Sequence, residues 1–267
     1  MKFSTFITFF FFILTIQPIS AQISPPGLDG TKTVSWGVVG FSQALNKRLT
    51  LTVYGGASRM SDPKSWGLLH KQGIAVYNHE FLYKFSPRWQ ASLANSFRVQ
   101  NLYSEENPYE SEDPSYRYEL RYYGRLYYRQ QFNKVSVNYA FRPEARTFYS
   151  PDWRASARPL ELRFRLKATA SLPINEDKTN IIVSGNEFLT AVDEYQSTIP
   201  ADHHHTWSNY HFTEDRFSIY FRHIFKKSDI ILDLGLMEQF KSGEFTDPVS
   251  YLSFDVLFQN PFSKHVN

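Results

Sequence analysis

The fold of this chain is decided by residues 116–131, which read YRYELRYYGRLYYRQQ. Successive side chains of a β-strand point to opposite faces, and here one face is aromatic and apolar while the other is charged. The stretch is much longer than the usual strand of about five or six residues, and its length and two faces predict a strand that crosses a bilayer. The apolar face carries Tyr116, Tyr118, Leu120, Tyr122, Gly124, Leu126 and Tyr128, and the charged face carries Arg117, Glu119, Arg121, Arg125 and Arg129.

Other segments alternate in the same way and pair into predicted hairpins joined by short polar turns such as Asn133-Lys134. Longer connections, rich in Ser, Pro, Asp, Glu and Trp, separate one hairpin from the next. Short turns alternating with long loops are typical of outer-membrane barrels. The predicted strands are 34–43, 49–59, 74–85, 89–100, 116–131, 135–147, 160–172, 179–192, 215–225, 230–241 and 249–258, and the predicted loops are 60–73, 101–115, 148–158, 193–213 and 242–248.

This pattern predicts an all-β chain that forms a single antiparallel up-and-down transmembrane β-barrel. Eleven strands can be counted, yet single-chain bacterial barrels close with an even number. We therefore predict twelve strands, with ten as the alternative. Residues 23–34 could supply the missing strand, or one long segment could divide in two.

The amino terminus has the order of a secretory signal peptide. Lys2 precedes an apolar run over 6–16, Pro18 follows, and small residues lead to a predicted cleavage site after Ala21. The apolar run is shorter than the roughly twenty residues that a spanning helix needs, which argues against a membrane anchor. We predict a signal peptide at 1–21, a barrel domain at 22–267 and a location in the cell outer membrane.

Composition excludes several classes of function. The 267 residues contain no Cys, so disulfides and thiolate chemistry are excluded, and 17% are aromatic. The formal charge is only +3 and no basic motif with stacking aromatics is present, so no nucleic-acid partner is expected. A mean hydropathy of −0.41 is compatible with a barrel because half of each strand faces the interior.

The charged faces of neighbouring strands are predicted to line the lumen, since charges at membrane depth must face one another or water. We weigh two interpretations. In the preferred one, Arg and Glu pair across strands in a packed polar core; in the other, a basic, water-filled lumen favours anions. The candidate lumen residues are Arg117, Glu119, Arg121, Arg125, Arg129, Arg142, Glu144, Arg146, Glu161, Arg163, Arg165, Lys167, Glu214, Arg216 and Arg222.

Enzyme and metal signatures are weak, and we predict no catalytic residue, cofactor or metal. The chain has no nucleophile elbow, zinc-protease, Walker or dinucleotide motif. A lipid hydrolase would need a histidine such as His79 or His223, but both alternate with aromatic residues. Adjacent histidines at 203–205 diverge rather than converge on a metal, so a solvated loop is expected there. The acidic residues between 105 and 113 are likewise interpreted as an exposed loop rather than a calcium or carboxylate site.

Several motifs resemble those of the uncharacterised outer-membrane β-barrel family known as domain of unknown function 2490, over nearly the whole mature chain. This resemblance implies an exported barrel with no established activity and no catalytic residue to carry over. Such chains commonly end in an aromatic residue that the barrel-insertion machinery reads, whereas this chain ends with residues 265–267, His-Val-Asn. Phe258 or Phe262 would then have to serve. The motifs are Leu45-Asn46-Lys47-Arg48-Leu49 after a strand with Trp36, Glu119-Leu120-Arg121-Tyr122, Arg142-Pro143-Glu144-Ala145-Arg146, Glu161-Leu162-Arg163-Phe164-Arg165, Asn186-Glu187 and Glu214-Asp215-Arg216.

Three classes of function remain from the sequence. The first is an outer-membrane barrel in contact with lipid, structural or a narrow channel with an Arg-rich lumen and no known ligand. The second is an outer-membrane lipid-modifying enzyme. The third is a soluble periplasmic carrier of the lipocalin kind, in which the apolar faces would turn inward.

Overall fold

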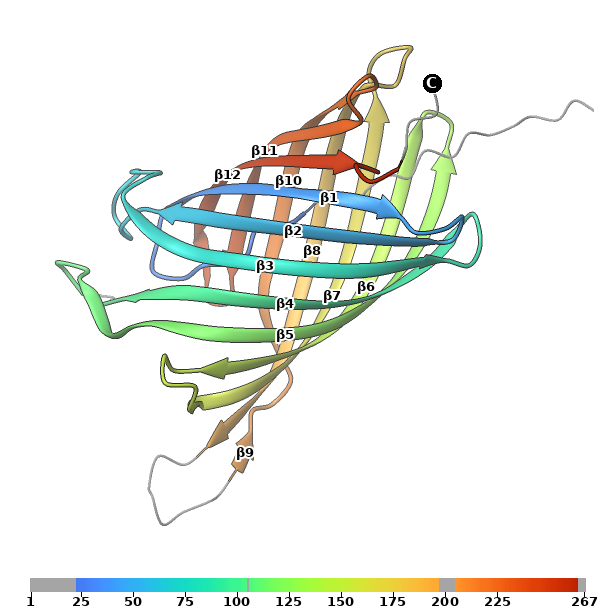
Figure 1. The fold of residues 1–267 in the computed structure, drawn as a ribbon. Helices are drawn as coiled ribbons and strands as arrows, with labels where there is room; N and C mark the ends of the chain where they lie inside the picture. The colour runs from blue at the N-terminus through green and yellow to red at the C-terminus, as the bar shows by residue number, and fades with distance from the viewer. Residues whose placement is uncertain (1–22, 105, 197–204, 264–267) are drawn as a thin grey trace, which may run out of the picture.

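A computed structural model describes residues 23–104, 106–196 and 205–263, so the predicted signal peptide lies outside the described residues. The described chain is built from β-strands (Figure 1). None of its residues belongs to a helix long and apolar enough to cross a membrane. The strands are β1 Thr33–Ala44, β2 Leu49–Met60, β3 Lys71–Lys84, β4 Trp89–Tyr103, β5 Ser111–Phe132, β6 Val135–Tyr149, β7 Ala155–Pro173, β8 Asn180–Gln196, β9 His205–Trp207, β10 His211–Phe225, β11 Ile230–Lys241 and β12 Glu244–Gln259.

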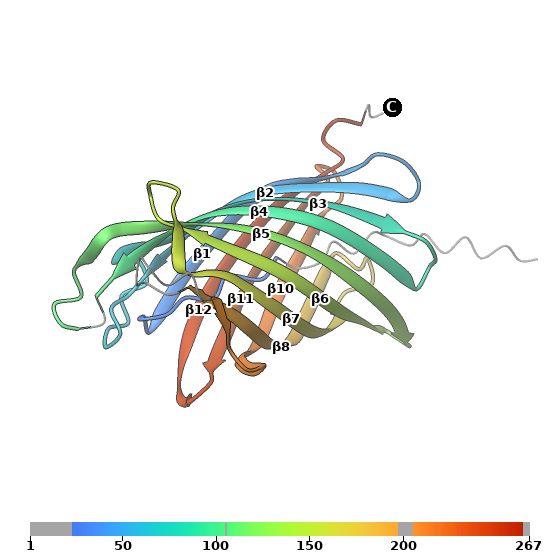
Figure 2. The same cartoon turned by 90° about the horizontal axis from the view of Figure 1, so that it is seen from below.

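Eleven of the twelve strands form a closed barrel. Consecutive strands pair antiparallel from β1 to β8, β8 then pairs with β10, and β10, β11 and β12 continue the order. The three-residue β9 adds to the end of β8 outside this circuit. Strand β12 returns to β1, and these two strands pair in parallel, from Thr33 opposite Ser250 to Ser42 opposite Gln259. Figure 2 shows the strands wrapped around one interior.

The predicted even number of barrel strands is therefore wrong, although the total of twelve strands agrees. All eleven strands counted from the sequence are present, and the twelfth is β9, not residues 23–34. An odd number makes the first and last strands run in the same direction, so they can close the barrel only in parallel. Residues 23–32 instead lie inside the barrel and lead to the start of β1. Ile23 and Leu28 of this segment are buried.

The two ends of the barrel differ in their connections. The turn end carries the short connections, such as the two-residue turn at Asn133 and Lys134, where Asn133 adopts a left-handed φ of 51°. The loop end carries the longer ones, including 61–70 and 104–110. Several strands continue past their predicted boundaries at the loop end, so the connection expected at 242–248 is reduced to the turn at Ser242 and Gly243. Residues 105 and 197–204 of the predicted loops lie outside the described residues.

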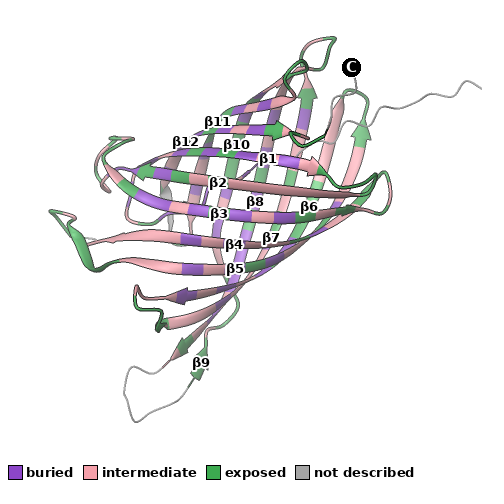
Figure 3. Cartoon of the chain, viewed as in Figure 1, coloured by how far each residue is buried: buried purple, intermediate pink, exposed green. Residues whose placement is uncertain are grey.

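The strand faces divide as the alternation predicts, with apolar side chains outward and charged side chains inward. Large apolar residues remain exposed around the barrel, among them Leu93 at 74%, Val39 at 61% and Leu166 at 58%. Buried and exposed residues alternate along the strands in Figure 3. A lipocalin-like carrier requires apolar side chains on the inward face, whereas the inward face of β4–β8 and β10 is largely charged.

The interior nevertheless has two unlike halves. The charged half consists of the inward side chains of β4–β8 and β10. The apolar half is a hydrophobic cluster on β11, β12, β1, β2 and β3, against which Ile23 and Leu28 of the N-terminal segment pack. The buried strand residues of the apolar half are Val34, Trp36, Val38, Met60, Ile74, Val76, Ile231, Met237, Val249, Tyr251 and Leu257.

Candidate functional site

The charged half of the lumen arises from strand alternation and register. Inward residues of β5, β6 and β7 face one another across the sheet, so that Arg121 pairs with Arg146 and Arg146 with Glu161. Like-charged neighbours in such a row are tolerated only where a carboxylate lies between them. The sequence supplies these carboxylates two residues away on each strand, and therefore on the same inward face.

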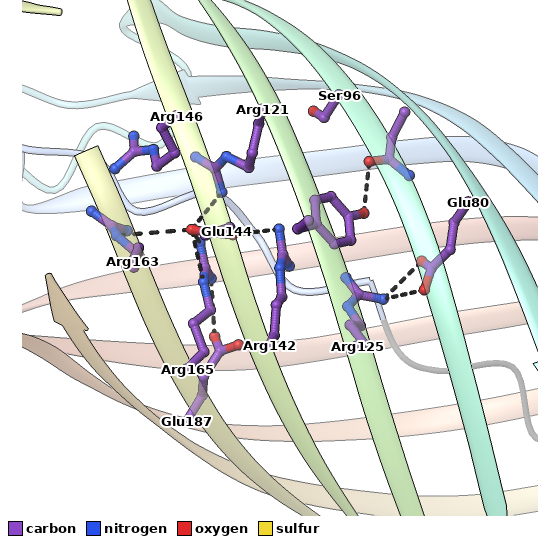
Figure 4. Close-up of polar contacts among 12 residues, drawn as sticks. Glu80, Ser96, Arg121, Arg125, Arg142, Glu144, Arg146, Arg163, Arg165 and Glu187 are labelled. Atoms are coloured by element: carbon purple, nitrogen blue, oxygen red, sulfur yellow. Dashed lines mark hydrogen bonds and ion pairs between the residues drawn. The ribbon is translucent and has the colours of Figure 1, made fainter. Parts of the chain in front are cut away.

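Glu144 lies at the centre of the charged half, with its side chain fully buried. Its carboxylate accepts hydrogen bonds from Arg165, at 2.8 Å, and forms an ion pair with Arg142, whose nitrogen lies 2.7 Å from the second oxygen. A nitrogen of Arg121 lies 3.5 Å away. Arg163 approaches to 3.8 Å. Figure 4 shows these arginines converging on Glu144 from β5, β6 and β7. One buried carboxylate thus contacts several guanidinium groups at once.

The ion pairs continue on both sides of Glu144 as a connected network. Arg121 and Arg146 bind Glu119 at 2.6 and 2.9 Å, and Arg146 reaches on to Glu161 at 2.5 Å. Arg163 then links Glu161, at 2.7 Å, to Glu214, at 3.2 Å. Buried charges are tolerated when they are paired and hydrogen-bonded. The described charges of this part of the lumen are thus paired with one another across the strands.

The far side of the network reaches β8 and β10. Arg216 binds Glu214 at 2.5 Å and lies 3.6 Å from Glu187, which is 3.5 Å from Arg165. Gln239 also donates to Glu214 and accepts from Tyr251, joining the network to the apolar half.

The remaining candidates lie outside this connected network. One nitrogen of Arg125 donates to both carboxylate oxygens of Glu80, at 2.8 and 3.1 Å, and Arg222 binds Asp233 at 2.6 Å. Arg117 donates to Gln100 at 3.0 Å, and Lys167 donates to Ser24 at 2.6 Å. The Arg129 side chain makes no hydrogen bond or ion pair with a described residue, and its Nε is buried.

Several lumen residues were missed because most are isolated charges on mostly apolar or neutral strands, and Asp193 because it was assigned to the predicted loop 193–213. Asp233, for example, is flanked on β11 by outward leucines, and its place in the alternation was the signal that could have revealed it. The missed acids raise the number of carboxylates available to the arginines. These buried residues are Glu80, Arg98, Glu187, Asp193, Asp233 and Asp255.

The N-terminal segment, residues 23–32, threads through the lumen between the two halves. Its turn-end part is bound by Lys167 through Ser24, and the Pro25 carbonyl accepts from Arg216 at 3.0 Å. Toward the loop end, the Leu28 amide donates to the Tyr251 hydroxyl at 2.8 Å. A Cβ at Gly27 would overlap Arg216, and it would lie 2.9 Å from both Gln239 and Glu214. Glycine therefore permits the close approach of the segment to the network.

The residues considered for enzyme or metal chemistry do not converge in the described structure. His79 lies between Tyr77 and Phe81 on the outer face, in a tilted contact with the first ring and an edge-on contact with the second. His223 packs edge-on against Phe225 there and bonds Asn180 at 2.6 Å. Among the described residues no group of three potential metal ligands occurs.

The histidine and acidic residues of the loops, considered above as metal or catalytic candidates, also do not come together among the described residues. His205 bonds Glu194 at 2.7 Å at the loop end, while residues 203 and 204 lie outside the described part. In the acidic loop, Glu106, Glu110, Glu112 and Asp113 are exposed, and residue 105 is not described.

Two comparisons bear on this barrel. The family described as "Protein of unknown function (DUF2490)" matches residues 33–248, which run from the first residue of β1 into β12. A crystal structure of a mutant of the ferric enterobactin receptor PfeA from Pseudomonas aeruginosa is similar at a TM-score of 0.29 and 14% identity, over 75% of this chain and 36% of the receptor chain. The chain thus spans about a third of that receptor's length. No curated protein matches it. Because the family match covers most of the barrel, the chain belongs to the DUF2490 family of proteins of unknown function.

Proposed function

We propose that this chain is an outer-membrane barrel with a closed lumen, a structural element that does not conduct ions in the state described here. The observation that carries the proposal is the filling of the lumen by the paired charges around Glu144 and by the N-terminal segment. Two small cavities remain beside the N-terminal segment, one of about 60 Å³ in the charged half and one of about 80 Å³ lined by both halves. Each offers room for only a few water molecules, at about 10–15 Å³ for each.

The outer face supports the membrane part of this proposal. Two aromatic clusters lie at different heights, Trp89 with Tyr128 toward the turn end and Tyr118 with Trp153 toward the loop end. On β5, Tyr118 and Tyr128 are about 33 Å apart along the strand. At a strand tilt of about 40° this corresponds to about 25 Å in height, which matches the apolar band between the aromatic girdles of known barrels. An exposed apolar belt of this kind is costly in water and favourable in lipid.

The proposed partners follow from the same surface. Lipid tails would contact the belt, and the barrel-insertion machinery would bind the last strand during biogenesis. Of the two terminal aromatic candidates, Phe258 is the one within β12, while Phe262 follows the strand and packs edge-on against Phe41 at 5.1 Å. We therefore assign the recognition role to Phe258.

Extraction and conductance test the proposal together. The protein is expected to leave washed outer membranes only with detergent, to migrate differently on gels before and after boiling, and to give no steady current in planar bilayers. A soluble protein would contradict the membrane assignment, and a steady open-channel current would contradict the closed lumen.

A matched pair of glycine variants tests what closes the lumen. Gly27→Leu introduces bulk where the segment meets Arg216, so it should displace the segment and raise the conductance. Gly37→Leu adds the same side chain on the outer face of β1, where a Cβ meets nothing within 4 Å, and it should leave the conductance unchanged. Equal currents from both variants would exclude the segment as the barrier.

A further inference from the structure

A small basic cavity lies in the charged half near the turn end, beside the N-terminal segment. Its volume is about 60 Å³. Arg129 and Thr169 on its wall lie toward the turn end and are partly exposed. The side chains that form it come from β5, β6, β7, β8 and β10, together with Ser24.

Strand register explains why a space exists here. Arg129, Asn138 and Thr169 lie opposite one another across β5, β6 and β7, and all three line the cavity. In the adjacent row, Ala140 stands between Tyr127 and Lys167. Because the Ala140 methyl group is much shorter than its neighbours in the row, it leaves an empty space. The longer side chains around this space carry hydrogen-bond donors.

The cations on this wall lack their full complement of carboxylates. The Arg129 side chain has no partner among the described residues, and the Lys167 ammonium hydrogen-bonds to the Ser24 hydroxyl and stands opposite Glu187 across β7 and β8. Arg142 uses one nitrogen for Glu144 and leaves its buried Nε without a hydrogen bond. Glu187 also lines the cavity, but it already lies between Arg165 and Arg216. An unpaired buried charge is costly, so a counter-anion here is favourable.

We propose that this cavity binds a phosphate-type oxyanion between Arg129 and Lys167, entering from the turn end. The volume corresponds to about four water molecules, which suits one tetrahedral group with its oxygens. Arg129 would supply its planar pair of donors and Lys167 its point charge, while the Asn138 amide and the Thr169 hydroxyl add neutral donors. This binding role goes beyond the proposed closed barrel and does not depend on whether the lumen conducts.

Titration calorimetry of the full barrel in an uncharged detergent tests the site, with inorganic phosphate in one series and a short-chain phosphatidic acid in another. We expect saturable binding to the wild-type protein. Arg129→Gln and Lys167→Met should each weaken it about tenfold or more, as expected when a charge-assisted hydrogen bond is lost. Ala140→Leu should abolish binding by filling the cavity with every charge retained. Binding of the lipid alone would identify a headgroup as the source of the phosphate.

Lys134→Gln is the matched control, because it removes a cation from the exposed turn between β5 and β6 without touching the cavity. It should leave the affinity unchanged. The gel shift on boiling, measured on every variant, separates loss of the site from loss of the barrel. No binding of either probe to folded wild-type protein would overturn the proposal, as would equal weakening by Lys134→Gln or full binding by Ala140→Leu.

Discussion

The apolar and charged halves of the lumen are stabilised by different forces on one continuous sheet. In the apolar half, Leu28 packs among side chains such as Val34 and Met237, and burial of apolar surface is the stabilising contribution. In the charged half, carboxylates such as Glu144 offset the desolvation of the arginines around them. A change of shape in the apolar half costs packing and leaves no charge uncompensated, whereas the loss of a shared carboxylate leaves buried guanidinium groups without a counter-charge. The two halves should therefore respond to substitution with different magnitudes.

The largest effect is expected from Glu144→Gln. The substitution keeps the shape but removes the negative charge shared by Arg142 and Arg165, leaving buried guanidinium groups uncompensated. Breaking one partner of a buried pair costs about 3–5 kcal/mol. We expect a correspondingly lower urea midpoint in detergent micelles, measured by tryptophan fluorescence.

The control for this substitution is Asp152→Asn. Asp152 pairs with Arg154 at 2.8 Å in the β6–β7 connection, where both side chains are exposed. Exposed ion pairs contribute little, so the midpoint should not move measurably. Equal shifts for the two substitutions would show that the network around Glu144 is not a buried, cooperative one.

A smaller effect is expected from Leu28→Ala in the apolar half. Leu28 is 1% exposed, but it belongs to a segment outside the sheet that can relax around a cavity. We therefore expect a loss of about 2–3 kcal/mol, in the lower part of the usual range for such substitutions. The comparison variant is Leu234→Ala on the outer face of β11, where the side chain is 46% exposed. A larger loss from Leu234→Ala would mean that the segment adds little to the barrel.

The sequence predicted the wall of the barrel better than its interior. Two-residue alternation persists over strands such as β5, so it located every barrel strand and separated Tyr122 on the outer face from Arg121 on the inner one. The N-terminal segment, residues 23–32, has no alternating pattern, so the sequence did not predict where it lies. The position of Leu28 depends on Tyr251, which lies 223 residues further along the chain, and no local pattern encodes that contact.

The sequence also did not predict which arginine pairs with which carboxylate. Alternation assigns Glu144 to the lumen, but which arginines it binds depends on register across three strands. Arg98 and Asp233 were overlooked because each is a single charge on a strand without a charged ladder. The even-number rule failed because residues 23–32 pass through the lumen and enter β1 at the loop end.

The smallest effect on stability is expected from a comparison of two neighbouring glycines on β2, one on the inner face of the barrel and one on the outer face. On β2, a Cβ at Gly56 would lie 2.6 Å from the ring of Trp36 inside the barrel, whereas a Cβ at Gly55 meets only the Val76 carbonyl, 3.9 Å away, on the outer face. Gly56→Ala should cost about 1–3 kcal/mol through overpacking. Gly55→Ala should be neutral or slightly stabilising, because alanine restricts the unfolded chain and fits the strand. Urea midpoints of the two variants measure the difference directly. If both are neutral, Trp36 can shift at little cost and the apolar half is loosely packed; if Gly56→Ala costs as much as Glu144→Gln, packing in the apolar half is as exacting as ion pairing in the charged half.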